Sequence, residues 1–135
     1  MSYLLDTNVL SEIVRQQPNP ALMKRIRRCR RHQLATSAMC VTELRYGALR
    51  SPAGEQLWDR IADDVLSLVR ILPLGEDEAV RAGDILAQLA QDGDSIEVED
   101  VLIGATALSR GLTMVTRNLR HFSRIPGLKV ESWYA

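Results

Sequence analysis

Several residue types are scarce in this sequence, and each scarcity excludes a class of protein. Cysteine occurs twice, as Cys29 and Cys40, with no CxxC or zinc-site spacing, so reduced thiols in a cytosolic protein are favoured over a disulfide framework. No apolar run is long enough to span a bilayer. No signal-peptide pattern opens the chain, because an acid stands at position 6 and no small-residue cleavage site follows. We therefore expect a protein of the cytoplasm with no membrane partner.

Aromatic residues and net charge are also low. The chain has 2 Trp, 3 Tyr and 1 Phe, which argues against a binding mode in which aromatic side chains stack on bases. Lys+Arg and Asp+Glu are equal at 17 each, so no overall positive field attracts nucleic acid. Nearly all the cations are arginine, which suits bidentate contacts to phosphate or carboxylate, although a GC-rich genome gives the same bias. Any contact with nucleic acid must therefore be local.

The sequence does contain a regular alternation of strand and helix patterns. Its 135 residues are 46% hydrophobic, which is enough for one compact domain over 1–135 with a core of its own. Apolar periodicity and turn residues predict strands at 3–5, 34–38, 70–74, 112–116 and 128–132, helices at 7–15, 21–31, 41–49, 54–69, 76–90 and 98–111, and a short loop or helix at 117–125. This order predicts an α/β sandwich whose central sheet is mainly parallel and flanked by helices.

Acidic and polar residues follow three of these strands. Asp6 follows the first strand, Glu43 lies in the expected opening turn of the helix after the second, and residues 116–118 follow the fourth. Ligands bind outside the carboxyl ends of the strands in such sheets, so these segments should meet at one edge. Each acid also has a structural alternative. Asp6 could cap a helix, and Glu43 could simply favour the helix dipole.

Asp100 is the most informative acid. Its neighbours at i+3, i+4 and i+7 are small or apolar, so it shares a helix face that should be buried. A carboxylate there is costly unless a cation or a metal compensates for it. Glu97 and Glu99, near the same helix start, more simply serve the helix dipole on the solvated side, although one of them could assist through a water.

Together these acids predict a metal site. Three carboxylates should converge at one sheet edge with no obvious lysine or arginine among them, and gathered like charges raise the pKa of one or more unless a cation is bound. Oxygen ligands favour Mg²⁺ or Mn²⁺, which bind through few carboxylates, several waters and substrate phosphates. The chemistry typical of such a site is phosphodiester hydrolysis by a metal-activated water.

Four sequence blocks carry a family resemblance. They are "YLLDTNVLSEI" (3–13), "TSAMCVTELRYG" (36–47), "EDVLIGATAL" (99–108) and "MVTRNLRHFSRIPGLKVESW" (114–133). In this order they resemble the conserved blocks of PIN-domain proteins, specifically the VapC-type ribonuclease toxins of bacterial toxin–antitoxin pairs. The resemblance implies a PIN-like three-layer sandwich over 1–135 and RNA cleavage with Mg²⁺ or Mn²⁺. It also implies a homodimer, neutralisation by a VapB-like antitoxin, and a higher toxin–antitoxin assembly.

The resemblance assigns roles to individual residues. Asp6, Glu43 and Asp100 match the family's acidic triad, as catalytic and metal-binding residues. Where family members often supply a further acid, this chain has Asn118 and His121. The accessory candidates are Asn118, Thr7, Asn8, His121 and Glu99. For His121 the alternative is a surface histidine beside the aromatic anchor Phe122.

Four arginines are candidate RNA contacts. Arg45 stands two residues after Glu43, and Arg117 lies in the segment after the fourth strand. Arg27 and Arg28 belong to "KRIRRCRR" (24–31), for which a solvated basic face is the default interpretation and a stripe that binds RNA phosphates is the functional one.

Two other functions remain open from the sequence. The chain could be a catalytically silent PIN-like binding or regulatory module that keeps the acids as a structural metal or partner site. It could also be an aspartate-based phosphotransferase with Asp6 as phospho-acceptor, but such enzymes usually have a second Asp two residues on, and position 8 is Asn. The amphipathic segment 54–90 offers an apolar surface, so we expect it to form the homodimer contact.

Overall fold

The centre of the molecule is a five-stranded sheet in which every neighbouring pair of strands is parallel. The structure, a computed structural model, describes residues 1–134. The strand order is β3-β2-β1-β4-β5. The strands are β1 (Tyr3–Leu5), β2 (Leu34–Ser37), β3 (Arg70–Leu72), β4 (Thr113–Val115) and β5 (Val130–Glu131). The predicted α/β fold with a parallel central sheet is confirmed.

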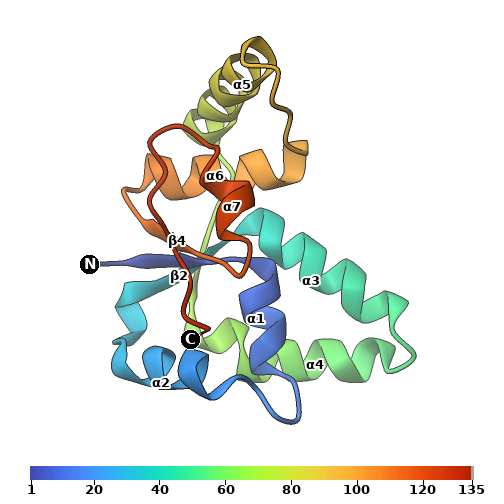
Figure 1. Cartoon of the computed structure of the whole chain (residues 1–135). Coiled ribbons are helices and arrows are strands. Elements are labelled where there is room, and N and C mark those ends of the chain that lie inside the picture. The colour runs from blue at the N-terminus through green and yellow to red at the C-terminus, as the bar shows by residue number, and fades with distance from the viewer. Residues whose placement is uncertain (135) are drawn as a thin grey trace.

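Helices cover both sides of this sheet. Figure 1 shows α5, α6 and α7 above the strands and α1, α2 and α4 below them, while α3 and α4 extend together to the right. The helices are α1 (Thr7–Ile13), α2 (Pro20–Arg28), α3 (Ala38–Arg50), α4 (Gly54–Asp64), α5 (Glu76–Gln91), α6 (Val98–Ser109) and α7 (Leu119–Phe122), with short 3-10 turns η1 (Arg31–Gln33) and η2 (Leu66–Leu68). In residues 1–134, no helix combines the length and the apolar composition that crossing a membrane requires.

The three inner strands form the core of the sheet. Leu4 and Leu5 of β1, Ala35 of β2 and Met114 of β4 are fully buried. A parallel sheet that is covered on both faces needs such continuous apolar strands, because neither face of the strand meets water. This explains why "YLL" and "TMV" read as apolar runs rather than as alternating patterns. Their buried ends then leave Asp6 and Thr116 at one edge of the sheet.

The helix after β2 begins earlier than the sequence pattern predicts. The Ser37 hydroxyl oxygen accepts a hydrogen bond of 3.1 Å from the Cys40 amide, which caps the helix so that α3 starts at Ala38. Glu43 therefore lies in the second turn, and its expected place in the opening turn is wrong. The helix dipole gives little reason for an acid there, since its effect falls off within the first turn.

Three other predicted elements are too long by at least three residues. The predicted helix 54–69 ends at Asp64, because the chain must tighten into η2 before it enters β3. The predicted helix 21–31 ends at Arg28, since Cys29 takes an extended backbone. The last strand pairs over Val130–Glu131 only, rather than over 128–132.

Candidate active site

A cavity of about 500 Å³ opens at the carboxyl ends of β1 and β4. Four stretches of chain line it, and no lining side chain comes from positions 44–99. The lining residues are Asp6, Thr7, Asn8, Ser11, Glu12, Arg15, Glu43, Asp100, Arg117, Asn118, His121 and Phe122. Asp6, Glu43 and Asp100, which are far apart in the sequence, therefore face one cavity.

Asp6 is buried and fixed on both carboxylate oxygens. Its Oδ1 accepts a hydrogen bond of 2.8 Å from the Thr7 amide as it caps α1. Its Oδ2 accepts a hydrogen bond of 2.8 Å from the Thr116 hydroxyl. The side chain thus caps a helix and also belongs to the cavity, so the two interpretations of Asp6 are compatible. With both oxygens held, the carboxylate has a single orientation.

Thr116 is a site residue whose place at the sheet edge was predicted but whose role was not. It is fully buried, and while its hydroxyl donates to Asp6, the same oxygen accepts a hydrogen bond of 3.0 Å from the Asn118 amide. The chain after β4 is therefore tied to Asp6 through one hydroxyl. A threonine at the carboxyl end of a buried strand was the available signal, because a hydroxyl buried there requires a partner.

Thr7 connects the first two acids. Its amide donates to Asp6, and its hydroxyl donates a hydrogen bond of 2.6 Å to Oε1 of Glu43. The first residue of α1 thereby fixes the position of an α3 side chain relative to Asp6. Glu43 Oε2 has no hydrogen bond in the described part of the chain and remains available to a ligand.

Asp100 comes from the first turn of α6. Its Oδ2 lies 2.7 Å from Nε2 of His121, which belongs to the short helix α7. The side chains of Asp100 and His121 are 27% and 17% exposed. His121 is therefore not the surface histidine of the alternative interpretation, because its ring contacts Asp100 of α6.

Burial and neighbouring charge perturb Asp6. Desolvation raises its pKa from the ordinary value of 3.8 to about 6, and the hydrogen bonds from Thr116 and Thr7 only partly oppose this shift. The carboxylates of Asp100 and Glu43 make smaller contributions to the same rise. Without a cation, the site therefore disfavours its own full ionisation.

The donor set suits a hard divalent cation. Within residues 1–134, neither Asp6 nor Glu43 forms an ion pair with a lysine or arginine. The available donors are carboxylate oxygens, which Mg²⁺ and Mn²⁺ prefer. One oxygen of Glu43 stays unbonded. The pKa of Asp6 is raised mainly by burial and to a smaller extent by the two other carboxylates, and a bound cation would offset both effects. The residues present thus fit a divalent ion.

Glu12 forms a second, separate charge cluster at the cavity, which the sequence analysis also missed. It is 5% exposed, and its Oε1 accepts hydrogen bonds from Arg117 at 2.9 Å and Arg15 at 3.2 Å. Its Oε2 accepts a hydrogen bond of 3.0 Å from the Asn19 amide. Burial opposes ionisation, but these hydrogen bonds together hold the pKa of Glu12 below its ordinary value. The available signal in the sequence was an acid three residues after Val9, on a helix face that should be buried.

Replacing Glu12 with glutamine should destabilise the protein at neutral pH by about 1–2 kcal/mol, since the amide cannot balance two arginines. The pKa of Glu12 is lower in the folded state than in the unfolded chain. Its stabilisation is therefore present above the unfolded pKa and is lost as the pH falls through the folded value. Urea unfolding should show a difference between wild type and Glu12→Gln at pH 7 that shrinks in acid. A difference that does not change with pH would contradict this account. Arg15→Gln is the matched control, with a smaller effect because Arg15 is mostly exposed.

The other predicted site residues divide into two groups. Asn8, Asn118 and Arg117 line the cavity. Glu99 is exposed and lies outside it, whereas Glu97 has a carboxylate oxygen 3.8 Å from Nε2 of His121. Glu97, three residues before Asp100, lies on the same side of the helix as Asp100, so Glu97 and not Glu99 lies beside His121.

The remaining RNA-contact candidates do not line the cavity. Arg45 forms an ion pair of 2.9 Å with Glu55 and lies over the ring of Trp58. Arg27 and Arg28 are exposed at the end of α2. Of the four candidate arginines, only Arg117 lines the cavity. Arg15, which was not a candidate, also lines it.

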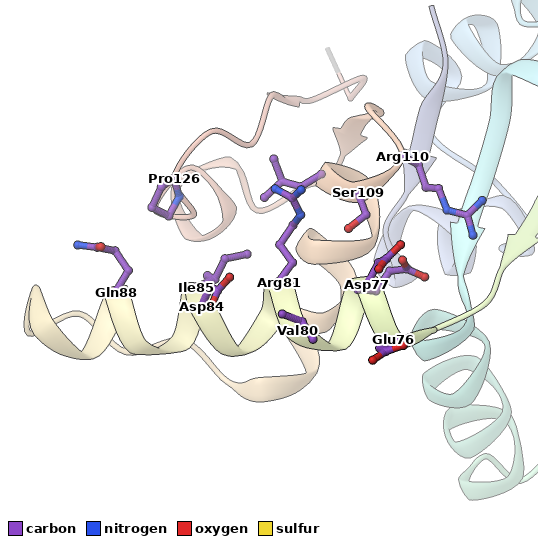
Figure 2. A pocket seen from close by; sticks show the side chains of 12 residues that line it. Glu76, Asp77, Val80, Arg81, Asp84, Ile85, Gln88, Ser109, Arg110 and Pro126 are labelled. Atoms are coloured by element: carbon purple, nitrogen blue, oxygen red, sulfur yellow. The ribbon is translucent and has the colours of Figure 1, made fainter.

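A larger groove, of about 1010 Å³, lies elsewhere. Figure 2 shows it between α5 and the end of α6, where Arg81 rises from α5 toward Ser109. Its lining mixes the acids of α5, such as Glu76 and Asp84, with arginines. The groove therefore mixes acidic and basic side chains, and Asp6, Glu43 and Asp100 do not line it. The smaller cavity, which these three acids do line, is the candidate active site.

Comparison with known proteins agrees with this geometry. The PIN domain pattern matches residues 3–128. The tRNA(fMet)-specific endonuclease VapC of Salmonella typhimurium is 36% identical over 98% of both chains, and Toxin FitB of Neisseria gonorrhoeae is 35% identical over 97% of this chain and 98% of its own. The crystal structure of DNA-bound VapBC from Salmonella typhimurium superposes with a TM-score of 0.89 and 32% identity over 98% of both chains. The protein therefore belongs to the PIN-domain family and, within it, to the VapC-type toxins.

Proposed function

We propose that the protein is a metal-dependent endoribonuclease and the toxin of a toxin–antitoxin pair. The observation that carries this proposal is the convergence of Asp6, Glu43 and Asp100 from three segments in one cavity. The absence of an arginine or lysine ion pair with Asp6 and Glu43 within residues 1–134 supports a role in holding a cation. The relatives named as ribonucleases and endonucleases span nearly the whole chain, which supports RNA as the substrate.

Asp6, Glu43 and Asp100 would hold the ion, which we propose to be Mg²⁺ or Mn²⁺. When bound, such an ion supplies the positive charge that activates water and stabilises the leaving oxygen in phosphodiester hydrolysis. Thr7 and Thr116 orient the carboxylates through their hydrogen bonds. This prearrangement means that the acids need little reorganisation when substrate arrives.

Arg117 and Arg15 are the groups best placed to bind RNA phosphates. Both line the cavity, and their side chains are 52% and 64% exposed. Glu12 holds one end of each guanidinium and leaves other N–H groups free to donate. Arg45, Arg27 and Arg28 could contact only RNA that extends beyond the cavity.

The proposed partners follow from the solved relatives. Structures similar to this chain include VapBC and FitAB complexes, some with DNA. We propose a VapB-like antitoxin that covers the acidic cavity with an arginine or lysine, whose charge satisfies the same carboxylates as a metal does. Because cellular RNA is the proposed substrate, we also propose a cytoplasmic location.

The purified protein should cleave a mixed RNA pool when Mg²⁺ or Mn²⁺ is added and should stop when the metal is chelated. Restoring the metal should restore cleavage, which distinguishes metal dependence from damage by the chelator. A Glu99→Gln variant should cleave like wild type, because Glu99 is exposed and outside the cavity. Cleavage that persists in chelator, or that purifies away from the protein, would contradict the proposal.

We further propose that two copies of the chain pair through the region 68–80, within the amphipathic segment. Large apolar side chains are exposed there, namely Leu68, Ile71, Leu74 and Val80. Several large apolar side chains exposed within one short stretch of chain are typical of an interface between copies. Light scattering at micromolar concentration should report a dimer, and Ile71→Lys should shift it to monomer. A wild-type monomer at that concentration would contradict this pairing.

A further inference from the structure

His121 is held between a candidate metal ligand and an arginine. Its Nε2 lies 2.7 Å from Oδ2 of Asp100, and its Nδ1 lies 3.1 Å from Nη2 of Arg124. The ring also makes an edge contact with buried Phe122. Both ring nitrogens therefore have protein partners, and the ring has little freedom to turn.

The arginine determines which nitrogen of the ring carries the proton. A guanidinium has only N–H donors, so Nδ1 of His121 must accept the hydrogen bond from Arg124. In a neutral imidazole the other nitrogen is then protonated. We assign the proton to Nε2, which donates it to Asp100 in a hydrogen bond.

Arg124 is itself fixed by several contacts. It forms an ion pair with Asp94, in the loop between α5 and α6, and its Nε donates to the carbonyl of His121 at 3.4 Å. In Figure 1, α7 lies against α6. Gly104 of α6 allows the chain after α7 to approach closely, because a Cβ at this position would come within 2.6 Å of Ile125 Cδ1. The order of contacts from outside to cavity is thus Asp94, Arg124, His121, Asp100.

We propose that His121 is a positioning residue for Asp100, set by Arg124, and that it is not a metal ligand. By donating Nε2–H to Oδ2, it holds the carboxylate so that Oδ1 is presented to a cation. This inference rests on the proposed metal-dependent function. Residues that hydrogen-bond to a metal ligand commonly orient that ligand and adjust its affinity for the metal, and His121 would have this role toward Asp100.

The competing arrangement is a direct site made of Glu97, Asp100 and His121. One ligand atom from each lies within 4.8 Å of the others. Ligation through Nε2, however, would place the imidazole proton on Nδ1, where it would face the N–H donors of Arg124. Two donors would then oppose each other at 3.1 Å. The hydrogen-bond pattern therefore favours a donor at Nε2 over a ligand.

Two substitutions separate the two ring nitrogens. His121→Gln keeps an N–H donor near the place of Nε2, and His121→Asn keeps a polar atom near the place of Nδ1 but loses the donor to Asp100. Without RNA, calorimetric titration should show Mn²⁺ affinity about tenfold or more weaker in the Asn variant, and close to wild type in the Gln variant. Mg²⁺ should follow the same order. Both variants should melt at similar temperatures in chelator, which controls for loss of folding.

The tautomer of the His121 ring can be determined in the metal-free protein. The chain has 2 His, so a His32→Gln background leaves the ring of His121 as the only one. Nitrogen NMR of the metal-free protein at mildly alkaline pH should show Nε2 protonated and Nδ1 unprotonated. A proton on Nδ1 would overturn the assignment.

The outcomes distinguish this inference from the proposed function. Equal loss of Mn²⁺ affinity in both variants, with a larger loss for Zn²⁺ than for Mg²⁺, would make His121 a ligand, because imidazole suits Zn²⁺ better. Wild-type affinity in the Asn variant would remove the positioning role. A wild-type protein that binds no divalent ion would instead contradict the proposed metal site, and the NMR result would still decide the tautomer.

Discussion

Single alanine substitutions of Asp6, Glu43 and Asp100 should each lower the rate of RNA cleavage by about 100-fold or more. A bound divalent ion contributes several kcal/mol of transition-state stabilisation, and each 1.36 kcal/mol corresponds to about tenfold in rate. If the three acids hold one ion, removing any one of them removes most of that contribution. Steady-state cleavage of a labelled RNA, with Mg²⁺ and with Mn²⁺, measures the loss.

Double substitutions test whether the acids act as a unit. A pair such as Asp6→Ala with Asp100→Ala should cost little more than either change alone, because residues that act together have strongly non-additive effects. Glu99→Ala is the matched control, since it removes an exposed carboxylate from the helix that carries Asp100. Near-wild-type cleavage in any one single variant would remove that residue from the site.

Replacing Asp6 with asparagine should stabilise the metal-free protein in mildly alkaline buffer by about 1–3 kcal/mol. Burial, opposed in part by two hydrogen bonds and reinforced by Asp100 and Glu43, raises the pKa of Asp6 from 3.8 to about 6 in the folded protein. A shift of about two units corresponds to about 3 kcal/mol. The amide can keep the hydrogen bond from the Thr7 amide, and the Thr116 hydroxyl can accept instead of donate.

The sign of the pH dependence follows from the direction of that shift. A group with a raised folded pKa contributes stability below its unfolded value, near 3.8, and that stability is lost as the pH rises through about 6. Thermal unfolding in chelator should thus show an advantage for Asp6→Asn at about pH 8 that nearly vanishes at about pH 4. Added Mg²⁺ should stabilise wild type more than the variant, because binding to the folded state alone shifts unfolding. An advantage that is equal at both pH values would contradict this explanation.

Much of the fold could be predicted from the sequence because local and global preferences agree. Apolar runs such as "YLL" mark strands that are buried on both faces, and the helices between them have the 3.6-residue period. The errors fall at boundaries that tertiary contacts decide. A serine side chain moves the start of α3 to Ala38, and the approach to β3 ends α4 at Asp64.

The candidate site could be predicted in part. The three acids stood out because a carboxylate behind a buried strand or on an apolar face needs a reason. The role of Thr116 was missed because its partner Asp6 is 110 residues away. Glu12 was missed because its place at the cavity depends on Arg117, 105 residues away, although Arg15 and Asn19 also bind it. Arg45 was predicted near the substrate from its spacing to Glu43, and it does not line the cavity. Its partner Glu55 lies on the next helix, and sequence distance does not reveal this.

The cavity takes no side chain from positions 44–99, and this separates substitutions at the surface from substitutions in the site. Substitutions, insertions or deletions across α4, β3 and α5 alter the outer surface that other molecules meet. They leave the cavity-lining side chains unchanged so long as the core packing beneath holds. Substitutions of exposed residues on α4 and α5 should accordingly change surface contacts without abolishing catalysis, whereas Asp94, which holds Arg124, should be kept.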